Sequence, residues 1–171
     1  MTNGFKEDIV DSLQDHMHEY KSQLEKGFIQ QAYRGLMQYM QDLRSHFQKN
    51  YPDYDVPGNL YAGYMDMTYF AVIPSFLKQR RLKVAVVFLH EDFRFEVWLS
   101  GYNRQVQAQY WQIIKDANWQ HYQLVENPHK ADSILENLLV DNPDFSDLAD
   151  LTREIETGSI RFISDIERFL K

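Results

Sequence analysis

The run from Leu82 to Gly101, LKVAVVFLHEDFRFEVWLSG, restricts the fold of this chain more than any other stretch. Two β-rich segments flank His90–Phe93, which predicts an antiparallel hairpin with a four-residue loop built around a type I turn. Pairing Leu89 with Arg94 puts six apolar residues on one face: Val84, Val86, Phe88, Phe95, Val97 and Leu99. A slip of one residue would move this whole set to the other face, so the pattern specifies the register.

The second face of the same hairpin has a different character. The first strand is apolar here too, with Ala85 and Val87, which is typical of a strand covered on both sides. The second strand places Glu96 and Trp98 opposite them. A carboxylate at such a position needs a partner or water, because an unpaired buried charge costs several kcal/mol.

The spacing of apolar residues and the turn-forming residues predict two helices and one strand on the N-terminal side of the hairpin. Apolar residues at three- and four-residue steps predict a helix over 4–24, closed by Gly27, and a second helix over 28–49. The short link between them predicts an antiparallel helical hairpin. Residues 60–73 are expected to form a strand that contains Asp66.

Elements on the C-terminal side are helical apart from one strand. We expect a helix over 104–117 capped by Asn103, a weaker strand over 119–125, a short helix over 133–140, and two helices over 147–156 and 160–170. The capping-box spacing of Ser133 and Glu136 supports the short helix. Thr157-Gly158-Ser159 is read as a break or a kink between the last two.

The predicted order is therefore α-α-β-β-β-α-β-α-α-α. It defines an α+β fold with a mixed, mainly antiparallel four-stranded sheet covered by helices. No linker or repeat divides the sequence, so we expect a single domain over residues 1–171.

Composition excludes several classes of protein. The chain has no cysteine, which removes disulfides and thiolate chemistry and fits a cytoplasmic location. No apolar run approaches the roughly 18 residues of a membrane span. The net charge is −7, yet residues 74–125 hold seven basic and four acidic groups. This segment is basic, but the chain as a whole is acidic, and affinity for nucleic acid grows with the number of Lys and Arg contacts to phosphates. Nucleic acid is therefore an unfavoured partner.

Motifs for chemistry are missing from the sequence. It has no phosphate-binding loop, no nucleophile elbow and no metalloprotease motif. His16 and His18 stand two apart and point to different sides of a helix, so they are not expected to share a metal. His90-Glu91-Asp92 is expected to be a solvated loop. We therefore predict no metal, no cofactor and no catalytic residue.

One group of residues can still be argued as a candidate ligand pocket: Asp66, Arg94, Glu96, Trp98 and Arg104. Polar groups that converge inside an aromatic surround are typical of ligand sites. The competing interpretation is purely structural, with Arg94 and Glu96 paired on one strand face and Trp98 in the core.

Two resemblances accompany these residues. The strand order, with Glu96-Val97-Trp98 on the third strand, resembles the core of restriction-endonuclease-like nucleases, where an E-x-K or D-x-K motif binds magnesium. Trp98 stands where that family has lysine, and the preceding strand carries Lys83 and no acid, so the resemblance implies a catalytically degenerate nuclease. The phrases GYMDMTYFAVIP, VVFLHEDFRFEVWLSGYNRQVQ and TGSIRFISDIERFL resemble an uncharacterised bacterial domain of unknown function.

The sequence thus favours a soluble, non-enzymatic module that binds a small ligand or a protein through the Arg94/Glu96/Trp98 face. The alternative is a restriction-endonuclease-like nuclease or its catalytically degenerate descendant. An active enzyme would be recognised by carboxylates of Asp66 and Glu96 within about 5 Å of each other, close enough to share a cation.

Overall fold

The computed structural model describes residues 12–171 and divides into two compact units, one ending at Tyr39 and one from Met40 to Lys171. The division falls within helix α2 (Phe28–Asn50). The single domain expected from the sequence over residues 1–171 stays a prediction.

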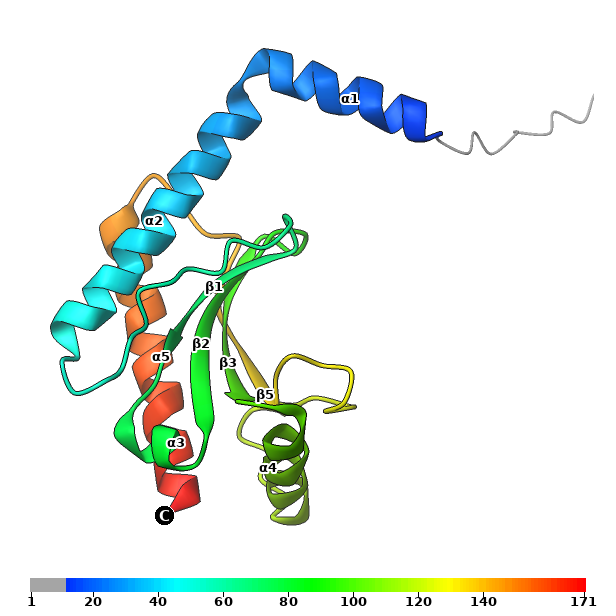
Figure 1. Ribbon diagram of the computed structural model, residues 1–171. Coiled ribbons are helices and arrows are strands. Elements are labelled where there is room, and N and C mark those ends of the chain that lie inside the picture. Colours follow the sequence, from blue (N-terminus) through cyan, green and yellow to red (C-terminus); the bar gives the residue numbers. More distant parts are fainter. Residues whose placement is uncertain (1–11) are drawn as a thin grey trace, which may run out of the picture. The chain divides into compact units, whose positions relative to one another are not determined.

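The first unit contains helix α1 (Leu13–Lys26) and the start of α2. Ser12 and Asp15 form a capping box at the start of α1, and Gly27, with φ of 77°, ends it as expected. The expected helix begins at residue 4, and its part before residue 12 lies outside the described residues. The predicted helical hairpin is wrong, since α1 has no buried residue and diverges from α2 at Gly27 (Figure 1). One linking residue is fewer than the two to five that reverse a helix.

The second unit is built on one five-stranded sheet in which all neighbouring strands are antiparallel, in the order β1-β2-β3-β5-β4. Its strands are β1 (Met67–Val72), β2 (Leu82–Leu89), β3 (Arg94–Gly101), β4 (Gln123–Leu124) and β5 (Leu135–Asp141). The α+β class is confirmed. The sheet has five strands where four were expected, and it contains no parallel pair.

The hairpin of β2 and β3 has the register that the sequence predicts. Leu89 pairs with Arg94, Val86 with Val97, and Val87 with Glu96. The loop between them has the expected four residues, with Phe93 in the left-handed region at φ of 51°. The alternation of apolar residues therefore sufficed to fix both faces of the hairpin.

Strand β5 replaces the short helix predicted over 133–140, and that prediction is wrong. The Ser133 hydroxyl does donate to Glu136 at 2.5 Å, as the capping-box spacing suggests. The backbone is nevertheless extended, since the Ile134 N–H donates to the Leu99 carbonyl of β3 at 2.6 Å. Pairing with the free edge of β3 outweighs the local helix signal.

Two predicted strands are shorter than expected. The segment before β1 turns back on itself, with Gly63 and Met65 both at positive φ, so that Tyr61 bridges Tyr69 of the strand itself. Asp66 lies in this turn instead of in a strand. The strand expected over 119–125 is confined to Gln123–Leu124 of β4.

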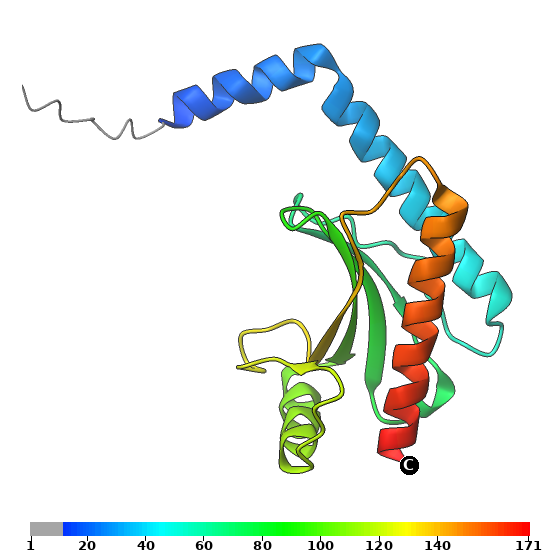
Figure 2. The same cartoon turned by 180° about the vertical axis from the view of Figure 1, so that it is seen from behind.

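The core lies on the face that carries Val84, Val86 and Val97. The end of α2 packs there through Phe47, whose ring centroid is 5.7 Å from that of Phe70 on β1. Helix α5 (Leu148–Leu170) lies along the same side of the sheet (Figures 1 and 2). Its buried residues are Leu151, Ile155, Ser159, Phe162, Ile163 and Ile166.

Helix α5 is one element, so the prediction of two separate helices with a break at Thr157-Gly158-Ser159, the first of the two alternatives left open there, is wrong. A Cβ placed on Gly158 would lie 2.5 Å from Leu139 Cδ2. Leu139 is the extra residue of a β-bulge, because Phe95 pairs with Val140 while Glu96 pairs with Leu138. Because Gly158 has no Cβ, the helix can approach the bulge closely at this position, and the glycine does not end the helix.

Two further helices complete the unit: α3 (Ser75–Gln79) and α4 (Arg104–Asp116). Asn103 caps α4 as predicted, its side chain accepting from the Val106 N–H at 2.9 Å. Helix α4 lies at the end of the sheet where β3 stops (Figures 1 and 2). Residues 12–171 include no helix with the length and apolar character to cross a bilayer.

We predict that Gly158 and Leu139 are energetically coupled. Gly158→Ala removes a glycine cost of about 1 kcal/mol from the helix interior but forces Leu139 to move. Urea denaturation measures the change in the free energy of unfolding that Gly158→Ala causes. We expect this change to be more favourable by about 1 kcal/mol in a Leu139→Ala background than in the wild-type chain. Gly35→Ala in α2, with nothing within 4 Å, is the control for helix propensity alone. Additive effects of the two substitutions would contradict the close approach.

We also predict an acid-dependent contribution from Asp165. The hydrogen bond from the Tyr122 hydroxyl, with help from the Arg168 cation, lowers the pKa of Asp165. A lowered pKa stabilises the folded state above the ordinary carboxyl pKa of about 3.9, and this stability is lost as the pH falls through the lowered value. Asp165→Asn should therefore reduce the melting temperature at pH 7, and the deficit should shrink below about pH 4.

The control is Asp116→Asn, which changes an exposed carboxylate at the end of α4. A deficit for Asp165→Asn that stays constant from pH 7 to pH 3 would show that the carboxylate charge is not what stabilises the fold.

Candidate functional site

The second face of the sheet is buried by its own side chains. Ala85, Val87 and Trp98 form a small cluster on this face, against which Met67, Tyr69 and Leu89 pack. Val87 has an exposed fraction of 0%. The sequence predicts helices over both faces of β2, whereas on this face side chains of the neighbouring strands β1 and β3 provide much of the cover.

Glu96 is the buried charge of this face, with an exposed fraction of 5%. Its Oε1 accepts from Arg94 Nε at 2.7 Å, and its Oε2 accepts from Trp98 Nε1 at 2.6 Å. The three residues stand at alternate positions of β3 and so point to the same side. The carboxylate thereby holds the Trp98 indole in one orientation.

A cavity of about 340 Å³ adjoins Trp98 on this face. Its small lining residues are Ala85, Ser100 and Gly101, which leave room beside the sheet. Its aromatic lining residues are Tyr61, Tyr69, Trp98 and Tyr102. Tyr61 and Tyr69 stack with ring centroids 4.9 Å apart, so the aromatic wall is ordered by the turn that precedes β1.

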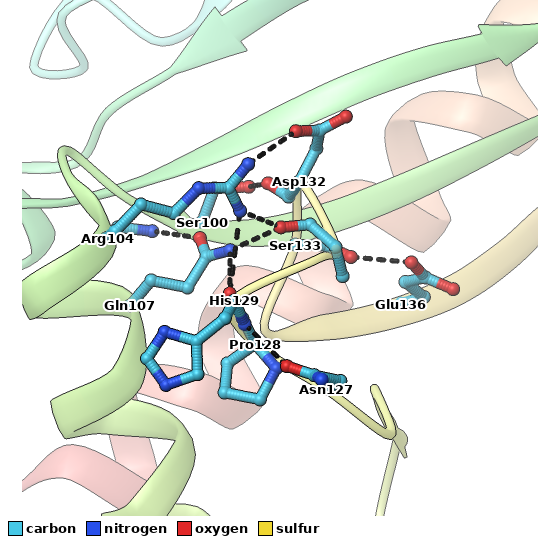
Figure 3. A network of polar contacts seen from close by, with 11 residues as sticks. Ser100, Arg104, Gln107, Asn127, Pro128, His129, Asp132, Ser133 and Glu136 are labelled. Carbon is cyan, nitrogen blue, oxygen red and sulfur yellow. Dashed lines mark hydrogen bonds and ion pairs between the residues drawn. The ribbon is translucent and has the colours of Figure 1, made fainter.

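The start of α4 closes one side of the cavity through a polar network (Figure 3). Arg104 donates to the carbonyls of Pro128 and Ala131 and to Asp132 Oδ1. Ser100 donates to the Asp132 carbonyl at 2.8 Å. Side chains from β3 and α4 thus hold the loop before β5 by its backbone.

Gln107 is the buried centre of that network, with an exposed fraction of 3%. Its amide nitrogen donates to the carbonyls of Pro128 at 3.2 Å and Ala131 at 2.8 Å, and its oxygen accepts from the Gly101 N–H at 3.2 Å. A Cβ on Gly101 would lie 2.6 Å from the Gln107 backbone nitrogen. Glycine is required here because β3 and α4 approach each other so closely.

Three charged side chains line the cavity: Lys83, Arg104 and Asp132. Asp132 and Arg104 form an ion pair at 3.4 Å. Lys83 Nζ lies 5.9 Å from the centroid of the Tyr69 ring, and no carboxylate of residues 12–171 pairs with it. Burial, together with the charges of Tyr61 and Asp132, raises the pKa of Tyr69, so its hydroxyl keeps its proton at neutral pH.

The structure brings together four of the five residues proposed from the sequence. Trp98 and Arg104 line the cavity, while Glu96 binds Trp98 and Arg94 beside it. Asp66 is not part of this group. Its carboxylate accepts the Tyr64 N–H at 2.8 Å in the turn, and backbone hydrogen bonds from Met67 and Tyr64 lower its pKa.

Sequence reasoning missed Tyr61, Tyr69, Lys83 and Asp132. A signal for two of them was present, because Lys83 is the only charged residue of β2 and lies two positions before Ala85. Tyr69 follows from the pairing of β1 with β2, in which it stands opposite Val87. Tyr61 and Asp132 depend on how two loops fold, which periodicity does not reveal.

Metal ligands do not converge anywhere in the described part of the chain: residues 12–171 include no group of three His, Asp or Glu side chains that could hold an ion. His90, one of the loop residues considered from the sequence, bonds through its Nε2 to Thr68 Oγ1 at 2.9 Å, and burial lowers its pKa.

Together, these features define an α+β domain with a ligand-sized cavity on one face of an antiparallel sheet. Over residues 13–170 the chain matches a family described as Domain of unknown function (DUF7000), and it belongs to that family. The expected family of unknown function is thereby confirmed, whereas the nuclease resemblance gains no support. No curated protein and no solved structure matches the chain significantly.

We predict that Arg94→Ala destabilises the protein more than Glu96→Gln. Removing Arg94 leaves a carboxylate that is 5% exposed with one partner, which costs about 3 kcal/mol. Removing the Glu96 charge leaves the Arg94 side chain, which is 37% exposed and can be hydrated, and Gln still accepts from Trp98, so the cost is about 1 kcal/mol. Urea denaturation at neutral pH measures both, and the reverse order would contradict the buried pair.

Proposed function

We propose that this chain is a non-enzymatic module that binds a small molecule in the cavity beside Trp98. The observation that carries the proposal is a hollow of about 340 Å³ in which aromatic side chains meet a few polar groups. Ligand sites in proteins are concave, largely apolar and start at about 300 Å³, with few polar groups to fix the ligand. The volume fits a metabolite-sized molecule.

Rigidity of the cavity walls supports this proposal. The Trp98 indole is held by Glu96, and the wall formed by α4 is held by the fully bonded amide of Gln107. Walls that are ordered before binding need not be ordered by the ligand, which reduces the entropic cost of association. Such preorganisation is what a binding protein needs.

The degenerate nuclease remains the alternative, and it has less support. Both oxygens of Glu96 already accept hydrogen bonds, and the carboxylate of Asp66 caps a turn. A shared cation would have to replace these bonds. An active nuclease of this type predicts magnesium-dependent cleavage of DNA or RNA that is lost in Glu96→Ala. The binding proposal and a degenerate descendant both predict no cleavage, and only the binding proposal predicts a ligand beside Trp98.

Location and partners stay as the sequence predicts them. The lack of cysteine fits the reducing cytoplasm, and we expect the module to act there. We expect neither nucleic acid nor a membrane as partner, and a small molecule is favoured over a protein because the candidate site is a cavity.

The proposal predicts that small aromatic molecules shift the NMR signals of the cavity. Among the three indole N–H signals, the one from Trp98 should move when fragments of positive, neutral and negative charge are added at millimolar concentration. Ala85→Leu should abolish the shift by filling the hollow. Tyr61→Ala, which removes a 42% exposed wall residue, should weaken it without touching the core.

The control is Ala71→Leu, since Ala71 pairs with Ala85 across β1 and β2 but does not line the cavity. A Trp98 signal that responds to no fragment, or a response that survives in Ala85→Leu, would exclude the cavity as the binding site.

A further inference from the structure

Of the two cations that line the cavity, Lys83 is the one without a carboxylate partner among residues 12–171. Arg104 forms an ion pair with Asp132 at 3.4 Å and donates hydrogen bonds to two backbone carbonyls. Arg94, on the same face, forms an ion pair with Glu96. Lys83 Nζ lies over the ring of Tyr69, 5.9 Å from its centroid. An excess positive charge therefore remains at the cavity wall.

The position of Lys83 in β2 makes this excess unusual. The residues that follow it on the same face are Ala85 and Val87, both buried, and Lys83 itself is only partly exposed. Partial removal of a lysine from water costs free energy unless an anion replaces the water. A bound anion would supply that partner through a charge-assisted hydrogen bond.

The surroundings of Lys83 favour a negative ligand over a positive one. Asp132 is the single carboxylate among the residues that line the cavity, and it is already paired. The start of α4 reaches the cavity at Asn103 and Arg104, and the N-terminal end of a 13-residue helix adds a positive potential. Two of the seven basic residues of 74–125, Lys83 and Arg104, line the cavity.

The shape of the cavity favours a flat ligand. Ala85, Ser100 and Gly101 present little side-chain volume along the sheet. The rings of Tyr69 and Trp98 rise from β1 and β3, which lie on either side of β2. A planar ring can pack against such aromatic walls over much of its area, in offset-stacked or edge-to-face geometry.

We propose that the cavity binds a planar aromatic carboxylate, with the ring between the aromatic walls and the carboxylate on Lys83 Nζ. This assignment rests on the proposed binding function and adds the chemical class of the ligand. Lys83 then acts as the residue that selects for charge, while Tyr69 and Trp98 select for a flat apolar body.

Three probes with the same ring and different charges test the assignment: indole-3-carboxylate, indole-3-carboxamide and tryptamine. We expect the carboxylate to bind the wild-type chain at least about tenfold more tightly than the amide, as one charge-assisted hydrogen bond permits, and tryptamine to bind most weakly. Dissociation constants come from titrations that follow the Trp98 indole N–H signal. The affinity of the carboxylate should fall with added salt more than that of the amide.

Variants of Lys83 locate the charge preference. Lys83→Met should remove the difference between carboxylate and amide, and Lys83→Arg should keep it. Lys115→Met is the matched control, because Lys115 lies over an aromatic ring, Trp111, at 4.6 Å but does not line the cavity. The amide signals of each variant report whether it remains folded.

The outcomes separate the two proposals. Equal binding of carboxylate and amide, or an unchanged preference in Lys83→Met, overturns the assignment of an anionic ligand and leaves the binding cavity intact. Failure of all three probes also overturns the assignment of an aromatic carboxylate, and the mixed-charge fragments that report on Trp98 then decide whether the cavity binds at all.

Discussion

The register of β2 against β3 is the constraint on which the second unit depends. With Leu89 opposite Arg94, every large apolar residue of β3 except Trp98 faces the helices α2 and α5. The same register places Ala85 and Val87 beside Trp98 and Glu96 on the other face. A shift of one residue would bury Glu96 in the helical core and remove the cavity. One pairing therefore determines both the core and the candidate site.

Glu96 contributes to the stability of the sheet and also orients Trp98 in the wall of the cavity. Its burial would be costly if it were alone, but two hydrogen bonds satisfy its oxygens, one of them charged. The sequence showed that a charge would fall here, and it left open whether that charge served packing or a ligand. In the structure the charge has a structural role, because the carboxylate orients the Trp98 indole that lines the cavity.

Local signals in the sequence were sufficient where the structure depends on neighbours along the chain. The hairpin register, the cap at Asn103 and the end of α1 at Gly27 are of this kind. Strand β5 is different, since the local pair of Ser133 and Glu136 forms yet the edge of β3 decides the backbone conformation. Gly158 was misread for the same reason, because only the distant Leu139 explains it.

The part of the candidate site that depends on neighbours along the chain could be predicted, and the rest could not. Arg94, Glu96 and Trp98 share a strand, and alternation alone puts them on one face. The cavity also needs Tyr61 from a turn, Lys83 from the next strand and Asp132 from a loop, which come together only through the fold. Asp66 was included because residues 60–73 were taken as one strand, and the turn at Gly63 and Met65 gives it another role.

A crystal structure of the protein with indole-3-carboxylate would show whether the cavity binds a planar aromatic carboxylate through Lys83. We expect density for the ring between Tyr69 and Trp98, and a carboxylate oxygen within hydrogen-bond distance of Lys83 Nζ, at about 2.7–2.9 Å. Ligand density at another surface, or a carboxylate that turns away from Lys83 into solvent, would contradict it.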